Sequence, residues 1–176
     1  GKKEDKISKD NPFLGGNKAL ELKFLKDEPP DEITDNNLFP FKVVLSIKNE
    51  GEFDLEGTDQ VRVNLKGFLP QDFNVVIGDI TALHPDNPPT SRKKDSEGDI
   101  IDAVEAFVTI PKDEGKDLLL GENKIKGNTE FLFRADVCYQ YGTDAISKIC
   151  ILENMISPAD DAICDPKGEK KVFSSG

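Results

Sequence analysis

The sequence predicts an all-β protein made of antiparallel strands. The clearest observation is the alternation of apolar and polar residues between Leu38 and Gly67, where two alternating runs flank a glycine-containing break at 49–52. A period of two is typical of a strand with one buried face and one solvated face. A second observation is that no segment of about a dozen residues shows the period of an amphipathic helix. We therefore expect strands joined by turns, with single helical turns at most.

The two alternating runs, 39–48 and 61–66, are predicted to be neighbouring antiparallel strands. A sheet of this kind can bury one face and leave the other in water, and turn residues separate the runs. The residues expected on the buried face are Phe39, Phe41, Val43, Leu45, Ile47, Val61, Val63 and Leu65.

Three further segments, 18–26, 74–77 and 99–110, are predicted to contribute strands. A proline-containing loop separates the first segment from the central pair, because proline donates no ladder hydrogen bond. The register of the third segment is ambiguous, since apolar residues occur on both of its parities. The residues expected to point inward are Leu20, Leu22 and Phe24 in the first segment and Val104, Ala106, Val108 and Ile110 in the third.

The segment 129–152 is the second strong β element. After a turn at 142–144, its second half is predicted to return beside its first half as a hairpin. Strands at short, irregular spacing with turns between them favour an immunoglobulin-like antiparallel β-sandwich of about seven to nine strands. The residues of the first half that are expected to point inward are Phe131, Phe133, Ala135, Val137, Tyr139 and Tyr141.

The chain is expected to form one sandwich domain, 18–165, between two polar ends. Residues 1–17 are predicted to be a polar tether, and residues 166–176 a C-terminal linker or the start of a following domain. The longest stretch without apolar periodicity is the loop 84–99, and a loop of that length is usually functional or disordered. Both ends read as cut, so we expect more chain on one or both sides.

The composition is acidic, with 23 Lys and Arg against 34 Asp and Glu and a formal net charge of −11. Nucleic-acid binding needs a basic face, so this balance argues against a nucleic-acid partner. No run approaches the roughly 18 apolar residues of a membrane-spanning helix. We therefore expect contact with a membrane only through an anchor outside this chain.

The loop 84–99 has a basic tip, Arg92, Lys93 and Lys94, on an otherwise acidic protein. This contrast suggests a contact site, and a solvated mobile loop is the alternative. The edges of the predicted sheets are the other plausible contact surfaces, because an edge strand can add a strand from a neighbour.

No catalytic site is predicted. His84 is the single histidine, and no GxSxG turn or other nucleophile motif accompanies it. The run 95–99 resembles part of a calcium loop, and the pair Asp160-Asp161 could also supply oxygen ligands. The run lacks the complete calcium-loop spacing, so no cofactor is predicted and calcium is the alternative that stays open.

The three cysteines are disulfide candidates. A hairpin with a turn at 143–145 would place Cys138 opposite Cys150 on the polar face, within bridging distance. The alternative is a bridge between Cys150 and Cys164, which would tie down the C-terminal end. The spacing leaves the pairing open, and free buried thiols are the third possibility. A disulfide would indicate an oxidising, extracytoplasmic setting.

The run from Phe39 to Lys66 resembles the immunoglobulin-like modules of the cell-adhesion-related type, which occur in tandem in archaeal and bacterial cell-surface proteins. The resemblance is carried by a strand, Asn49-Glu50-Gly51 and a second strand. It implies an extracellular or cell-surface location behind an anchor and a polar tether, and it supplies no catalytic residues. Four further segments are similar to a set of uncharacterised archaeal envelope proteins: 11–16, 29–32, 39–41 and 138–151.

The expected function is that of a non-enzymatic structural or binding module in a secreted or cell-surface assembly, such as an envelope, adhesin or filament subunit. The expected partners are proteins, copies of the same chain among them. A virion structural protein, as a capsid decoration or tail module, is the first alternative. An accessory domain of an extracellular enzyme is the second, because a fold does not by itself determine a function.

Overall fold

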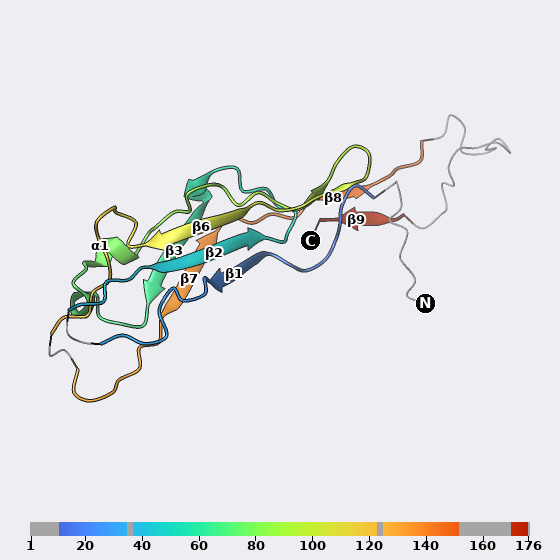
Figure 1. Ribbon diagram of the computed structural model, residues 1–176. Helices are drawn as coiled ribbons and strands as arrows, with labels where there is room; N and C mark the ends of the chain where they lie inside the picture. The colour runs from blue at the N-terminus through green and yellow to red at the C-terminus, as the bar shows by residue number, and fades with distance from the viewer. Residues whose placement is uncertain (1–10, 35–36, 123–124, 152–169, 176) are drawn as a thin grey trace.

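The computed structural model describes residues 11–34, 37–122, 125–151 and 170–175 (Figure 1). In these residues the strands pair antiparallel throughout. Helix in the described ranges is limited to α1 (Ile77–Ile80) and two 3-10 turns, Thr58–Gln60 and Pro70–Phe73. The prediction of an all-β, antiparallel protein is confirmed at this level.

The first sheet has three strands in the order β1 (Leu20–Phe24), β2 (Val43–Asn49) and β6 (Glu105–Ile110). The central strand β2 pairs with β1 on one side and β6 on the other, so that Ile47 lies opposite both Leu22 and Ala106. The inward residues predicted for the middle of this sheet are buried: Val43, Leu45, Ile47, Ala106, Val108 and Ile110.

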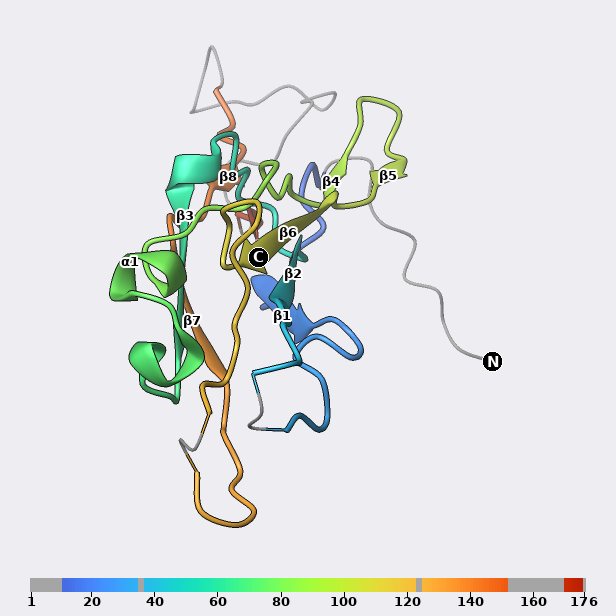
Figure 2. The same cartoon turned by 60° about the vertical axis from the view of Figure 1, so that its left-hand side comes forward.

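The second sheet pairs β3 (Val61–Lys66) with β7 (Arg134–Tyr139). The prediction that β2 and β3 are neighbours in one sheet is therefore wrong. Side-chain alternation specifies which face of a strand is buried, but it does not specify which strand lies beside it. In Figures 1 and 2, β3 and β7 form a second layer against the sheet that contains β2 and β6.

The apolar faces of the two sheets share one core. Both sheets contribute to it, and the connections between the strands add further side chains. The buried apolar residues of this core are Val43, Leu45, Ile47, Leu55, Val61, Val63, Leu65, Phe73, Val75, Ile80, Val108, Ile110, Leu118 and Leu120.

Two short pairs of strands lie outside these sheets: β4 (Lys93–Lys94) with β5 (Ile100–Ile101), and β8 (Ala145–Ser147) with β9 (Val172–Ser174). The predicted hairpin within 129–152 is wrong, because β7 bonds to β3 and β8 bonds to β9. Asp144 does not close a tight turn; its carbonyl accepts a hydrogen bond from the Ser175 N–H at 2.9 Å. Strand β9 lies in the range expected to be a C-terminal linker.

The strand predicted near 74–77 is also wrong. Asn74 has a left-handed backbone, with φ of 55°, and its side chain donates to the Leu119 carbonyl at 3.1 Å. Asparagine tolerates this conformation better than most residues, and the chain turns here into α1. Three apolar residues expected inside are exposed because the strands are shorter than predicted: Phe39, Val104 and Tyr141.

One side of the two sheets is closed by the segment 82–87. Leu83 exchanges two backbone hydrogen bonds with Val63, at 2.8 and 3.0 Å, and these occupy the outer edge of β3. The Asp86 N–H donates to the Phe107 carbonyl at 2.9 Å and occupies the outer edge of β6. This segment therefore bridges the edges of both sheets on the same side.

Asn49, the first residue of the Asn-x-Gly pattern, is a buried hydrogen-bonding centre. Its Nδ2 donates to the carbonyls of Phe53 and Pro89 at 2.8 and 3.2 Å, and its Oδ1 accepts from the Gly51 N–H at 3.2 Å. The side chain holds the end of β2 against the 84–99 loop. A buried polar group that loses its partner is costly, so this residue stabilises the connection between the two sheets.

We expect Asn49→Ala to lower the free energy of unfolding by about 2–3 kcal/mol, because it leaves buried carbonyls without a donor. Urea unfolding followed by circular dichroism measures this loss. The matched control is Asn17→Ala at an exposed position, which is expected to change the free energy by about 0.5 kcal/mol or less. Equal effects of the two substitutions would contradict the role of Asn49.

Candidate functional site

The basic residues of the 84–99 loop have partners within the chain. Lys93 Nζ lies 3.0 Å from Asp54 Oδ2, and Arg92 Nε lies 3.4 Å from Asp102 Oδ1. Burial acts to raise the pKa of Asp54, but hydrogen bonds from the Ser91 N–H and Lys93 hold that pKa below its ordinary value. The charge that was predicted to face a partner is therefore largely balanced internally.

Lys94 ties the loop to the N-terminal segment. Its Nζ donates to the carbonyls of Asn11 and Phe13 at 2.9 and 2.8 Å. Leu14 and Gly15 add backbone hydrogen bonds to the carboxylate of Glu52, at 2.6 and 2.9 Å. Part of the predicted tether is thus bound to the folded body, while a contact role for the loop stays a prediction.

In the calcium-like run 95–99, the carboxylate of Asp95 accepts hydrogen bonds from the backbone of the same run. Asp95 Oδ1 accepts hydrogen bonds from the N–H groups of Glu97 and Asp99, both at 2.9 Å. Within the described ranges, no group of three or more His, Cys, Asp or Glu side chains is arranged to hold a metal ion. The pair Asp160-Asp161 lies outside those ranges.

His84 forms a hydrogen bond with the backbone of β3. Its Nδ1 lies 2.7 Å from the Val61 carbonyl and donates a hydrogen bond to it. Ser91, one of the two serines near His84 in the sequence, is 2% exposed, and its N–H donates to Asp54 Oδ1 at 2.9 Å. Both residues act in the structure as parts of the packed connection between β3 and β6.

The cysteines are separated by the strand pairing. Cys138 lies opposite Arg62 on β7 and carries a free, exposed thiol, so the predicted Cys138–Cys150 bridge is wrong. The bridge depended on the predicted hairpin, and that hairpin does not form because β8 pairs with β9 and does not return along β7. Cys150 is not a free thiol. Cys164 lies outside the described residues, and the Cys150–Cys164 bridge stays a prediction.

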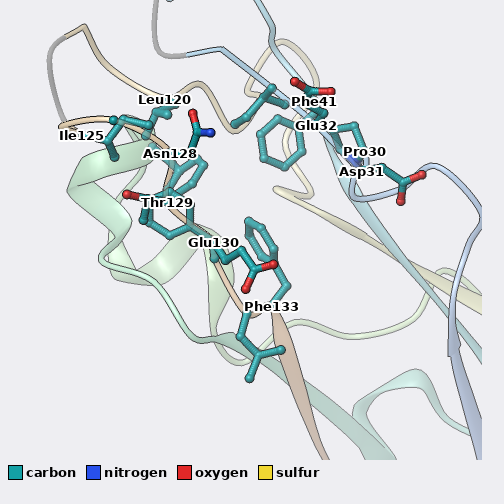
Figure 3. Close-up of a pocket in the computed structure, with 15 residues that line it drawn as sticks. Pro30, Asp31, Glu32, Phe41, Leu120, Ile125, Asn128, Thr129, Glu130 and Phe133 are labelled. Atoms are coloured by element: carbon teal, nitrogen blue, oxygen red, sulfur yellow. The ribbon is translucent and has the colours of Figure 1, made fainter.

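A cavity of about 760 Å³ opens at the end of the fold where the chain enters β2 and enters β7 (Figure 3). Its floor is part of a cluster of phenylalanine rings that also packs the core, with Phe41 and Phe133 at a centroid distance of 6.0 Å. Asp31, Glu32 and Glu130 contribute carboxylates to its lining. The cavity combines an aromatic floor with acidic walls.

Strand β1 is an open edge of the first sheet. The Leu25 N–H donates to the Val44 carbonyl, and the Ala19 carbonyl accepts from Glu50, so the odd-numbered residues of β1 direct their backbone groups toward β2. These groups alternate along a strand. Leu20, Leu22 and Phe24 therefore direct theirs away from the sheet. In the described part of the chain, no other backbone group bonds to them.

Among the residues that the structure describes, β7 is the open edge of the second sheet. The Gln140 N–H donates to the Gln60 carbonyl at 3.1 Å, so the even-numbered residues of β7 face β3. The backbone groups of Ala135, Val137 and Tyr139 point the other way. Because the segment 82–87 bridges the edges of β3 and β6, the strand orders place both open edges on the opposite side.

The open side exposes apolar side chains that belong to the core face. Leu22 and Phe24 lie opposite the buried Ile47 and Leu45, and directly opposed residues share a face of the sheet. They are nevertheless 39% and 38% exposed. In the described residues β1 is the edge strand of its sheet and pairs on one side alone, whereas Leu20 still packs on the core.

The outward faces of both open edges carry balanced charges. On β1, Lys23 Nζ lies 2.9 Å from Glu21 Oε1. On β7, the ammonium group of Lys66 and the guanidinium group of Arg134 hold the pKa of Asp136 below its ordinary value. Neither edge therefore presents a net charge that would repel a second strand.

No family model matches the chain, and neither a curated protein nor a solved structure matches it. Across the described ranges, none of the helices has the length and apolar character needed to cross a bilayer.

The sequence led us to predict contacts at the sheet edges, which stays a prediction, but it did not identify which edges are open. The signal for β1 is present in Leu20-Glu21-Leu22-Lys23-Phe24, a short strand whose two polar positions carry opposite charges. Which edge a strand occupies depends on the order of strands in the sheet, and the local pattern does not contain that order.

Proposed function

We propose that this chain is a non-enzymatic structural or binding module of a secreted or cell-surface assembly, built on an immunoglobulin-like β-sandwich. The observation that carries the proposal is the open side formed by the edges of β1 and β7. Unpaired edge groups bind additional strands through main-chain hydrogen bonds. The half-exposed Leu22 and Phe24 add apolar surface that a bound strand would cover.

The extracellular part of the proposal rests on separate support. The sequence resembles modules of archaeal and bacterial surface proteins, as described above. A bridge between Cys150 and Cys164 would fit an oxidising compartment. Two sheets that share one core, in the order β1-β2-β6 and β3-β7, support the sandwich architecture.

Surface labelling of intact cells tests the proposal. Cells that produce the native protein are treated with an amine-reactive biotin reagent that does not cross membranes, and a cytoplasmic protein of the same cells serves as the control. We expect the chain to be labelled before lysis and to be recovered with protein partners after chemical cross-linking. Labelling that occurs only after lysis would refute a surface location.

A further inference from the structure

We propose that β1 joins this chain to a second copy of itself, through a two-fold antiparallel pair of β1 strands. The inference rests on the proposed function of a binding module, because it names the partner of one open edge. The pairing would extend the three-stranded sheet β1-β2-β6 into a continuous sheet across two copies.

The hydrogen-bonding phase of β1 restricts how two copies can meet. Only Leu20, Leu22 and Phe24 direct backbone groups away from β2, so only these residues can exchange N–H···O bonds with a second strand. A two-fold pair centred on Leu22 places Leu22 opposite its own counterpart. The same register places Leu20 opposite Phe24 of the second copy, so every outward group of β1 finds a partner.

The charges on the outward face favour the register centred on Leu22 over the registers shifted by one residue. With Leu22 at the centre, Glu21 lies opposite Lys23 of the second copy, and the symmetry repeats this pair. Centring the strands on Glu21 or on Lys23 would place like charges directly opposite each other, which is destabilising in a sheet. The sequence of β1 is therefore complementary to itself in one antiparallel register.

The core-facing side of the pair also becomes better covered. Leu22 and Phe24 are 39% and 38% exposed in the single chain. In the two-fold pair, Leu20 and Phe24 of opposite copies lie side by side, and two Leu22 side chains meet at the axis. Burial of this apolar surface adds a driving force to the main-chain hydrogen bonds.

A head-to-tail contact between β1 and β7 is the competing arrangement, and such a heterologous contact produces a closed ring or an open filament. Its best antiparallel register places Lys23 opposite Asp136 and Glu21 opposite Cys138. It offers one opposite-charge pair where the two-fold pair offers two. The carboxylate of Asp136 already lies near two cations, 2.5 Å from Lys66 Nζ and 3.0 Å from Arg134 Nε, whereas Glu21 and Lys23 are paired with each other at 2.9 Å and can exchange partners between the two copies.

A charge-exchange experiment tests the register. The mass of the whole chain is measured by sedimentation velocity under reducing conditions, for the wild type, Glu21→Lys, Lys23→Glu and the double variant. The wild type is expected to form a dimer. Each single variant places like charges opposite each other at both symmetric pairs, and the dissociation constant is expected to rise by roughly tenfold or more.

Two further samples are expected to recover the dimer. In an equimolar mixture of the single variants, the lysine at position 21 of one copy faces the glutamate at position 23 of the other. The double variant exchanges both charges and is again complementary to itself. Lys126→Glu changes an exposed lysine away from the strand by the same charge, and it is expected to leave the dimer unchanged.

Three results would overturn the proposal. The first is a wild-type chain that stays monomeric at about 1 mM. The second is association that neither single variant weakens. The third is a ring or filament that Lys23→Glu disrupts and Glu21→Lys does not, which would indicate the β1–β7 contact. Circular dichroism checks that each variant is folded. Because surface labelling does not depend on dimerisation, a labelled monomer would reject this inference and leave the proposed function standing.

Discussion

Replacement of Phe73 by alanine is expected to lower the free energy of unfolding by about 3–5 kcal/mol. Phe73 is 0% exposed. Its ring packs edge-to-face against Phe68 and Phe131, at centroid distances of 4.9 and 5.0 Å, and also contacts Phe41 and Phe133. Deleting the ring removes apolar contacts from both sheets and leaves a cavity that the surrounding rings can fill only in part.

Urea unfolding measured by fluorescence or circular dichroism determines this loss, and Phe39→Ala is the matched control. Phe39 was expected on the buried face of the central strand, but it is 50% exposed. The control substitution is therefore expected to cost about 1 kcal/mol or less. A larger loss at Phe39 than at Phe73 would mean that the aromatic cluster is not the centre of the core.

Replacement of Gly67 by alanine is expected to lower the free energy of unfolding by roughly 2–5 kcal/mol. Gly67 follows β3 with φ of +104°, a conformation that disfavours every residue with a side chain. A Cβ atom at this position would lie 1.7 Å from the Leu132 carbonyl oxygen. The backbone just before β7 would have to move, and the β3–β7 pairing would be disturbed.

Gly98→Ala separates the two contributions. Gly98 has a similar φ of +92°, but no atom lies within 4 Å of the position of an added Cβ. This substitution therefore reports backbone strain alone, and a cost of roughly 1–3 kcal/mol is expected. The same unfolding measurement on both variants gives the difference. Equal losses would show that the approach of Leu132 to Gly67 contributes nothing.

The pairing of the strands is a feature of the fold that the local sequence pattern does not predict. The alternation in 43–47 and 61–65 correctly predicted two strands and their buried faces, because a period of two is a local property of the chain. Both strands share the core, but β2 pairs with β6 and β3 pairs with β7. The alternation would look the same for neighbours in one sheet and for strands that face each other across a core.

At the candidate site, too, some features can be predicted from the sequence and others cannot. The charges of Glu21 and Lys23 and the apolar residues around them can be read directly from the sequence. Their exposure cannot, since Leu22 alternates in the same manner as the fully buried Ile47 opposite it. The difference arises because β1 is the edge strand of its sheet in the described residues, whereas β2 lies between β1 and β6.

The position of the cysteines also depends on strand pairing that the local sequence does not specify. A turn signal lies midway between Cys138 and Cys150, and a hairpin at that turn would place them opposite each other, which is one of the pairings that the sequence left open. The turn residues are present, but Asp144 bonds to Ser175 and the chain leads away from β7. A turn signal indicates that the chain changes direction, and it does not select the strand that the chain meets next.

The strand-rich class of this protein, the inward face of its central strands and its acidic, polar character can all be predicted from the amino-acid sequence. Each of these three properties follows from composition or from a local period, and none depends on the rest of the fold. The order of the strands and the open edges of β1 and β7 emerge only when the chain is folded. These features depend on contacts between residues far apart in the chain, where the free energy of a common core selects among pairings that local patterns do not distinguish.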